Sequence, residues 1–188
     1  GWLDLFMANG ATNFIEARQR LGEVYPLQER NQLFRNVSGK TYDNITDVAG
    51  ALCDHLEVTR GASFGDLDND GFSDILISNN SGPARLFLNR VKSQAHWLGV
   101  SLQTADQSTP KLQCRIVAEL GDNHTLIRTP RTDGSYLSTN DPRVIFGLGH
   151  YADDVTLRVH WSDDSVETFK DIQIDQYVTL KKGEGVVE

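Results

Sequence analysis

The feature that most constrains the fold is a ten-residue segment that occurs twice in the chain. Residues 1–10 (GWLDLFMANG) align with residues 71–80 (GFSDILISNN), and the glycine, aspartate and asparagine positions match in register. A second match, at a shorter offset, links residues 33–36 (LFRN) to residues 86–89 (LFLN). Short repeated strands separated by turn residues are typical of β-propeller blades and other radial β repeats. We therefore expect residues 1–92 to form part of a β-propeller.

The repeat is too short to make a complete structure of this kind. Units that cannot bury their hydrophobic faces alone need roughly three or more stacked copies, and this sequence carries fewer than two. We therefore expect the chain to be the C-terminal part of a longer protein, with further propeller blades on its N-terminal side.

The two matches have different offsets, which indicates an insertion between them. The offsets are 70 and 53 residues, so 70 minus 53 leaves 17 inserted residues between Asn9 and Leu33. Within this stretch, residues 13–24 (NFIEARQRLGEV) have the spacing of a short amphipathic helix. We expect it to decorate a surface loop.

From about residue 93 the repeat ends and apolar residues alternate with other residues. The alternating sets are Leu98, Val100 and Leu102; Cys114, Ile116 and Ala118; and Val155, Leu157, Val159 and Trp161. A period of two is typical of half-buried strands, and turn-forming residues separate these segments. The sequence therefore predicts an all-β chain in which residues 93–188 form a second domain, a small antiparallel β-sandwich-like unit.

One acidic segment carries the clearest chemistry in the chain. Four carboxylates lie within nine residues, and no lysine or arginine occurs from Gly61 to Ala84 to offset them. Such repulsion calls for solvent or a cation, and Ca²⁺ takes 6 to 8 oxygen ligands that a tight loop can supply from alternate positions. The predicted ligands are Asp66, Asp68, Asp70, the Phe72 carbonyl and Asp74.

The flanking residues separate this segment from the EF-hand and from a simple turn. Gly71 stands where a sharp turn is needed, which a residue with a Cβ would resist. Position 12 of the loop is Ile77 instead of the bidentate glutamate of an EF-hand, and the flanks read as strands. The alternative is a solvated acidic turn without a metal.

These residues resemble a known family. Residues 64–74 (FGDLDNDGFSD) resemble the calcium loop of FG-GAP or VCBS repeats, which build integrin-type β-propellers. Several further segments resemble the junction and C-terminal domain of the ASPIC/UnbV family, which includes the cartilage acidic proteins: residues 79–87, 96–98, 135–138, 141–143 and 146–149. Two positions depart from the family pattern: Gln113-Cys114, near the second strand of the C-terminal domain, and Asp163-Asp164, in the turn after Trp161. The resemblance implies a calcium-bearing propeller with a C-terminal all-β module, secreted or, in a bacterium, periplasmic or on the cell surface.

Other motifs in the chain favour structural interpretations. Residues 61–65 (GASFG) match the G-x-S-x-G nucleophile elbow, but the acidic loop and another strand follow where a helix is required. The five histidines lack zinc-binding spacing. We therefore assign no catalytic residue, and we expect Trp2, Trp97 and Trp161 to lie in the core.

Composition excludes several classes of protein. The formal net charge is −8, without a basic segment, so nucleic acid is not an expected partner. No apolar stretch approaches the roughly 18 residues of a membrane-spanning helix. Cys53 and Cys114 match no metal spacing and leave either one disulfide or two buried thiols open.

Together these features predict a calcium-binding extracellular interaction or scaffold module without catalytic activity of its own. Its partner would be an extracellular protein or a glycan. Two alternatives stay open: a carbohydrate-binding propeller module, and an accessory part of a secreted enzyme.

Overall fold

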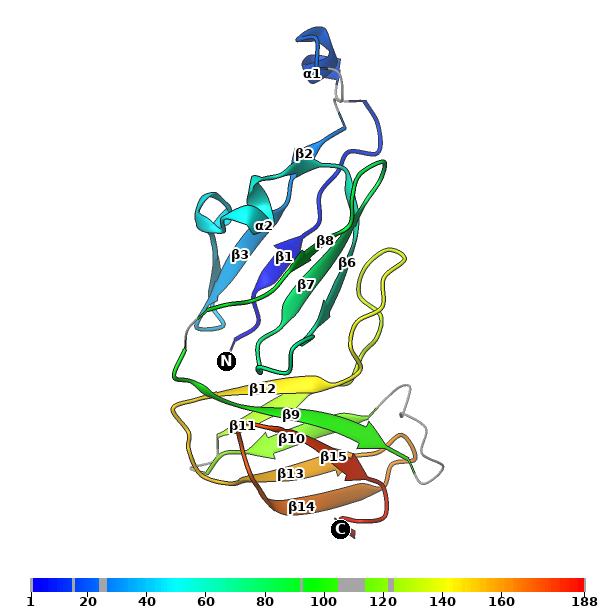
Figure 1. Ribbon diagram of the computed structural model, residues 1–188. Coiled ribbons are helices and arrows are strands. Elements are labelled where there is room, and N and C mark those ends of the chain that lie inside the picture. Colours follow the sequence, from blue (N-terminus) through cyan, green and yellow to red (C-terminus); the bar gives the residue numbers. More distant parts are fainter. Residues whose placement is uncertain are drawn as a thin grey trace.

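The computed structural model describes residues 2–14, 16–23, 27–91, 93–104, 114–121 and 124–187. These residues form an all-β structure, as predicted, in which an N-terminal group of sheets stands above a C-terminal group (Figure 1). The chain passes from the first group to the second between strand β8 (Arg85–Phe87) and strand β9 (His96–Gln103).

The N-terminal group contains two three-stranded antiparallel sheets that reflect the repeat in the sequence. Their strand orders are β1-β3-β4 and β6-β7-β8. The bounds are β1 (Leu5–Met7), β3 (Gln32–Val37), β4 (Thr41–Asn44), β6 (Thr59–Gly65) and β7 (Asp74–Asn79). Repeated residues therefore occupy equivalent strands, because β1 corresponds to β7 and β3 to β8.

Smaller elements connect the two N-terminal sheets. They are helix α1 (Glu16–Arg20), a 3₁₀ turn (Thr46–Val48), helix α2 (Ala51–Asp54) and the paired strands β2 (Glu29–Arg30) and β5 (Leu56–Glu57). Helix α1 lies within the stretch predicted to be helical, and it has no buried residue. Residues 15 and 24 of that stretch lie outside the described residues.

The C-terminal group is a sandwich of two sheets, with strand orders β11-β10-β13-β14-β16 and β12-β9-β15. The remaining bounds are β10 (Arg115–Glu119), β11 (Thr125–Arg128), β12 (Val144–Gly149), β13 (Val155–His160), β14 (Val166–Ile172), β15 (Tyr177–Lys181) and β16 (Val186–Val187). The prediction of an antiparallel unit is wrong for one pair, because β15 runs parallel to β9. Alternation reveals which face of a strand is buried and carries no information on the direction of its neighbour.

The alternating residues fill the space between these two sheets. Leu98, Phe146, Ile116 and Leu157 come from four strands of the two sheets, and each is fully buried in one hydrophobic cluster. Trp161 belongs to the same cluster, as predicted. Burial of side chains this large contributes about 1.5–3 kcal/mol each, so the C-terminal sandwich has a core of its own.

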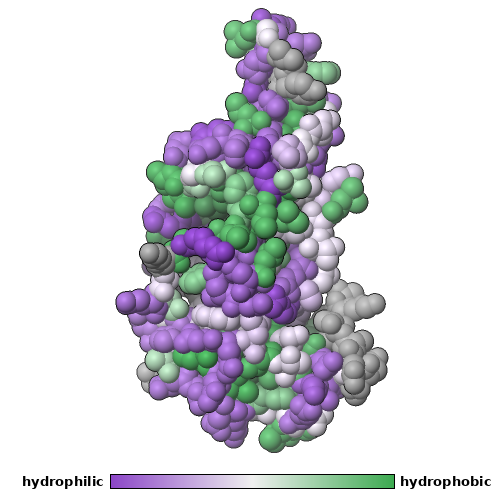
Figure 2. Space-filling view, in the orientation of Figure 1, coloured by the Kyte–Doolittle hydropathy of each residue, from purple (hydrophilic) through white to green (hydrophobic). Residues whose placement is uncertain are grey.

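The N-terminal sheets have a much thinner core. Their buried hydrophobic residues are Cys53, Val58, Ala62 and Ile77. A cavity of about 820 Å³ lies between apolar residues of both sheets, among them Phe6, Leu33, Ile75 and Phe87. Hydrophobic side chains gather on the visible face of this half in Figure 2. Neither sheet closes into a ring within the described residues, so the propeller stays a prediction.

The structure also places Trp2 and the two cysteines. Trp2 is 66% exposed and packs on the Gly39 turn, so its predicted place in the core is wrong. Cys53 and Cys114 are both free and buried, which selects two thiols over a disulfide in this structure. No helix among the described residues is long and apolar enough to cross a membrane.

Candidate metal site

The acidic loop, residues 66–73, connects β6 to β7 at the end of the N-terminal sheets that faces the C-terminal sandwich (Figure 1). Asn69 and Gly71 adopt positive φ angles of 59° and 87°, which fold the loop back on itself. Carboxylate oxygens of Asp66, Asp68 and Asp74 lie within 4.8 Å of one another. The structure therefore brings together three of the four aspartates predicted from the spacing.

Two of these carboxylates are almost completely buried and organise the loop. Asp66 is 2% exposed and accepts hydrogen bonds from the backbone N–H of Asp70 (3.1 Å) and of Gly71 (2.8 Å). Asp74 is 1% exposed and accepts from the N–H of Leu67 (2.9 Å) and of Asn89 (2.8 Å). Because a buried carboxylate is costly unless it is hydrogen-bonded, these contacts fix both side chains and the backbone around them.

The other two aspartates, Asp68 and Asp70, lie beside an arginine side chain from outside the acidic segment. The Arg90 guanidinium donates a hydrogen bond to Asp68 and lies 3.4 Å from an Asp70 carboxylate oxygen. The bond to Asp68 raises the pKa of Arg90 above its ordinary value. The sequence predicts that solvent or a metal ion offsets the repulsion among the four carboxylates. In the structure, the Arg90 guanidinium offsets part of this repulsion as well.

Tyr177 of β15 reaches the loop from the C-terminal sandwich. Its hydroxyl donates to the Asp66 carboxylate at 2.8 Å. Burial and the neighbouring Asp66 raise the pKa of Tyr177 well above its ordinary value, so the hydroxyl stays protonated and remains a donor.

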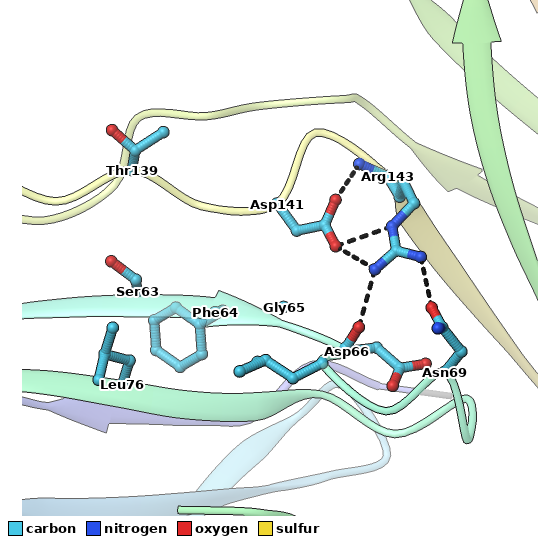
Figure 3. Close-up of a pocket in the computed structure, with 10 residues that line it drawn as sticks. Ser63, Phe64, Gly65, Asp66, Asn69, Leu76, Thr139, Asp141 and Arg143 are labelled. Carbon is cyan, nitrogen blue, oxygen red and sulfur yellow. Dashed lines mark hydrogen bonds and ion pairs between the residues drawn. The ribbon is translucent and has the colours of Figure 1, made fainter. Parts of the chain in front are cut away.

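Arg143 makes a second connection from the same side, just before β12. Its guanidinium donates to the Asp66 carbonyl oxygen at 2.7 Å and to the Asn69 side chain at 2.6 Å, and Figure 3 shows both contacts. Asp141 holds it in place at 2.6 Å, and the guanidinium lies over the Tyr177 ring, 4.3 Å from its centroid. Arg143 therefore contacts the loop, the Asp141 carboxylate and the Tyr177 ring at the same time.

Trp97 of β9 packs directly against the turn of the loop. An ideal Cβ built on Gly71 would lie 2.2 Å from a ring carbon of Trp97, which is too close for any side chain. Trp97 also packs on Tyr177, with ring centroids 5.2 Å apart. Glycine at position 71 thus serves both the positive φ angle and the contact between the two groups of sheets.

The donor set suits a hard cation in part. A carboxylate offers about four acceptor sites. Asp74 uses two of them on backbone N–H groups, and Asp66 uses three, on two backbone N–H groups and the Tyr177 hydroxyl, so both keep acceptor capacity for an ion. Asp68 completes a group of three. Asp70 is outside this group, and its Oδ1 accepts from the Phe72 N–H at 3.0 Å. The full predicted ligand set, including Asp70 and the Phe72 carbonyl, stays a prediction.

The sequence did not predict the residues outside the acidic segment that hydrogen-bond to the loop or pack against it. Arg90, Trp97, Arg143 and Tyr177 lie outside the acidic segment, and no spacing rule connects them to it. Two signals were available, because residues 96–98, which include Trp97, and residues 141–143, which include Arg143, were among the segments that resembled the C-terminal family. Neither segment indicated a position in space.

Comparison with protein-family models gives a match to the family described as ASPIC and UnbV, over residues 108–187. The match includes strands β10 to β16, with Arg143 and Tyr177, whereas β9 and the acidic loop precede it. A search of curated proteins found no match. The predicted ASPIC/UnbV domain is thus confirmed for the C-terminal part, while the FG-GAP or VCBS identity of the N-terminal part stays a prediction.

Proposed function

We propose that this chain is a calcium-binding interaction module of a secreted or periplasmic protein, in which the acidic loop stabilises the joint between two β units. The observation that carries the proposal is the burial of Asp66 and Asp74 beside Asp68, at the point where Trp97, Arg143 and Tyr177 meet the loop. The FG-GAP-like ligand spacing supports calcium over other cations.

Two groups of residues have different roles at this joint: one would bind the ion, and the other orients the ligands. Asp66, Asp68 and Asp74 would hold the ion, with Asp70 and the Phe72 carbonyl as the further predicted ligands. Bound Ca²⁺ would supply the positive charge that cancels the repulsion among the carboxylates. Tyr177 and Arg143 orient Asp66 from the sandwich, and Asn89 orients Asp74 from the connecting segment. A rigid joint of this kind positions the surrounding loops for an extracellular partner.

We propose no catalytic role for the G-x-S-x-G segment. Ser63 lies inside β6, and the chain continues through the acidic loop into β7, whereas a nucleophile elbow requires a turn into a helix. Carbohydrate binding is the second candidate, because Trp2 is exposed and can offer a stacking face to a sugar. Failure of the chain to bind any sugar on a glycan array would count against this candidate.

Calcium is expected to raise the melting temperature of the intact chain. At a free concentration about 100 times the dissociation constant, a ligand that binds only the folded state stabilises it by about 2.7 kcal/mol. For a chain of this length this corresponds to a rise of about 5–10 °C. Calorimetric melting in CaCl₂ and in excess chelator measures the difference.

Two variants make this experiment specific. Asp68→Ala removes a loop carboxylate and is expected to abolish the calcium effect, whereas Asp153→Ala, an exposed aspartate outside the loop, is expected to retain it. Identical melting curves with calcium and with chelator would contradict the proposal.

A further inference from the structure

The two three-stranded sheets of the N-terminal group face each other across the apolar cavity. Neighbouring residues of a strand point to opposite sides of its sheet, and directly paired residues on adjacent strands share a side. In the first sheet (β1-β3-β4) Phe6 pairs with Leu33, and in the second sheet (β6-β7-β8) Ile75 pairs with Phe87. All four line the cavity, where Phe6 also packs edge-on against Phe64, with ring centroids 6.3 Å apart. These pairs therefore identify the side that each sheet turns toward the other.

The repeat in the sequence shows which side of the repeated unit the first sheet uses for this contact. Phe6 corresponds to Leu76 at the offset of 70 residues, and Leu33 corresponds to Leu86 at the offset of 53. Leu76 and Leu86 also pair with each other, across β7 and β8. We call this the front side of a sheet: Phe6 and Leu33 in the first sheet, and Leu76 and Leu86 in the second. The first sheet thus contacts the second through its front side.

The second sheet uses the opposite side for the same contact. Its cavity-lining pair, Ile75 and Phe87, corresponds to Leu5 and Phe34 in the repeat, and these two residues also pair with each other. We call this the back side of a sheet: Leu5 and Phe34 in the first sheet, and Ile75 and Phe87 in the second. The two sheets therefore stack front to back. This contact leaves over the front side of the second sheet and the back side of the first.

The two sides left over carry exposed apolar residues. On the front side of the second sheet, Leu76 is 44% exposed and Leu86 is 48% exposed. On the back side of the first sheet, Leu5 is 49% exposed and Met7 is 41% exposed. Ile77, which corresponds to Met7 in the repeat and lies on the back side of the second sheet, is only 1% exposed. The same repeat position is thus buried on the side that faces the other sheet and exposed on the side that does not.

The central row of residues on each open side is uncharged, so covering it would bury no ionised group. The rows are Ser63, Leu76 and Leu86 on the second sheet, and Leu5, Phe34 and Asn44 on the first. A hollow of about 440 Å³ lies over the open front side, and Figure 3 shows Ser63 and Leu76 on one side of it and Thr139 on the other. The open front side therefore offers both an apolar surface and space for the side chains of a covering sheet.

We infer that the two open sides are stacking surfaces for further sheets of this same repeat. One such sheet would present its back side to Leu76 and Leu86, and another would present its front side to Leu5 and Met7. The contact between β1-β3-β4 and β6-β7-β8 selects this occupant, because it shows one sheet of the repeat seated on another in this orientation. The propeller predicted from the sequence requires stacked sheets, and the order of the repeated residues assigns the sides that meet.

A second copy of the intact chain is the probe, because each copy presents one open front side and one open back side. Front-to-back contacts are heterologous and leave an unused side at each end, so they add copies in series. Analytical ultracentrifugation in excess chelator is therefore expected to show dimers, trimers and larger species that increase with concentration. The chelator keeps this test separate from the proposed calcium site.

Two lysine variants distinguish the sides. Leu5→Lys places a charge on the open back side and Leu76→Lys on the open front side, so each variant alone is expected to remain monomeric. An equimolar mixture is expected to form a heterodimer and nothing larger, because the intact front side of the first variant fits the intact back side of the second. Leu5→Thr and Leu76→Thr, which keep a strand-favouring residue, are the second pair where a lysine variant does not melt cooperatively.

Ile127→Lys is the matched control. Ile127 is an aliphatic strand residue of β11 in the C-terminal sandwich, and it is 52% exposed, close to the exposure of Leu5 and Leu76. This variant is expected to form the full series of oligomers.

Three results would overturn the inference. An intact chain that stays monomeric at its highest soluble concentration shows that the open sides do not stack. Dimers of either lysine variant alone show that like sides pair or that another surface associates. A mixture of the two folded variants that stays monomeric, or loss of the series in Ile127→Lys, contradicts the front-to-back assignment.

Discussion

Replacing Gly71 with alanine is expected to lower the free energy of unfolding by about 3 kcal/mol or more, one of the largest effects of any single substitution in the loop. Two costs combine at this position. The φ angle of 87° strains any residue with a Cβ, and the Cβ would lie 2.2 Å from the Trp97 ring, where overpacking costs about 1–3 kcal/mol. Denaturant unfolding measured by tryptophan fluorescence gives the change.

Gly183→Ala is the matched control for this prediction. Gly183 has a similar φ angle of 92°, but no atom lies within 4 Å of the position its Cβ would take. Only the backbone cost of about 1 kcal/mol applies there. If both variants lost the same stability, the contact between Gly71 and Trp97 would contribute nothing to the joint.

Replacing Asp66 with alanine is expected to cost about 4 kcal/mol, even in the presence of a chelator. The substitution leaves the N–H groups of Asp70 and Gly71 and the Tyr177 hydroxyl without their acceptor. Each buried polar group that loses its partner costs about 1–3 kcal/mol. Denaturant unfolding in excess chelator measures this structural part separately from any bound metal.

Asp68→Ala separates the structural role from the proposed ion-binding role. Asp68 pairs with Arg90 at the surface, where ion pairs contribute about 0–1 kcal/mol. We therefore expect this variant to lose little stability in chelator and to lose calcium binding. A loss as large as that of Asp66→Ala would contradict this division of roles.

The sequence predicted the parts of the fold that depend on local pattern. Alternation identified the buried faces of β9, β10 and β13, because a strand that packs on a core exposes every second residue. The same pattern could not predict that β15 runs parallel to β9. Trp2 was misplaced because it lies before β1 (Leu5–Met7) and packs on the Gly39 turn, where its side chain remains 66% exposed.

The candidate site, like the fold, could be predicted only where it depends on residues close together in the sequence. Its acidic residues lie within nine positions of one another, so their spacing was visible in the sequence. The residues that hold the loop come from distant positions: Arg143 is 77 residues from Asp66, and Tyr177 is 111 residues away. Only the packing of the two β units brings them together, and a sequence pattern contains no such distance. Arg90 was missed for a related reason: the stretch without lysine or arginine ends at Ala84, before β8, and Arg90 follows β8.

Isothermal titration of calcium into the intact chain tests the central proposal most directly. We expect one ion to bind per chain, and we expect binding to be lost in Asp68→Ala and in Asp70→Ala. Retention of binding in both variants, or no binding by the intact chain, would contradict the assignment of the acidic loop as a calcium site that joins the two β units.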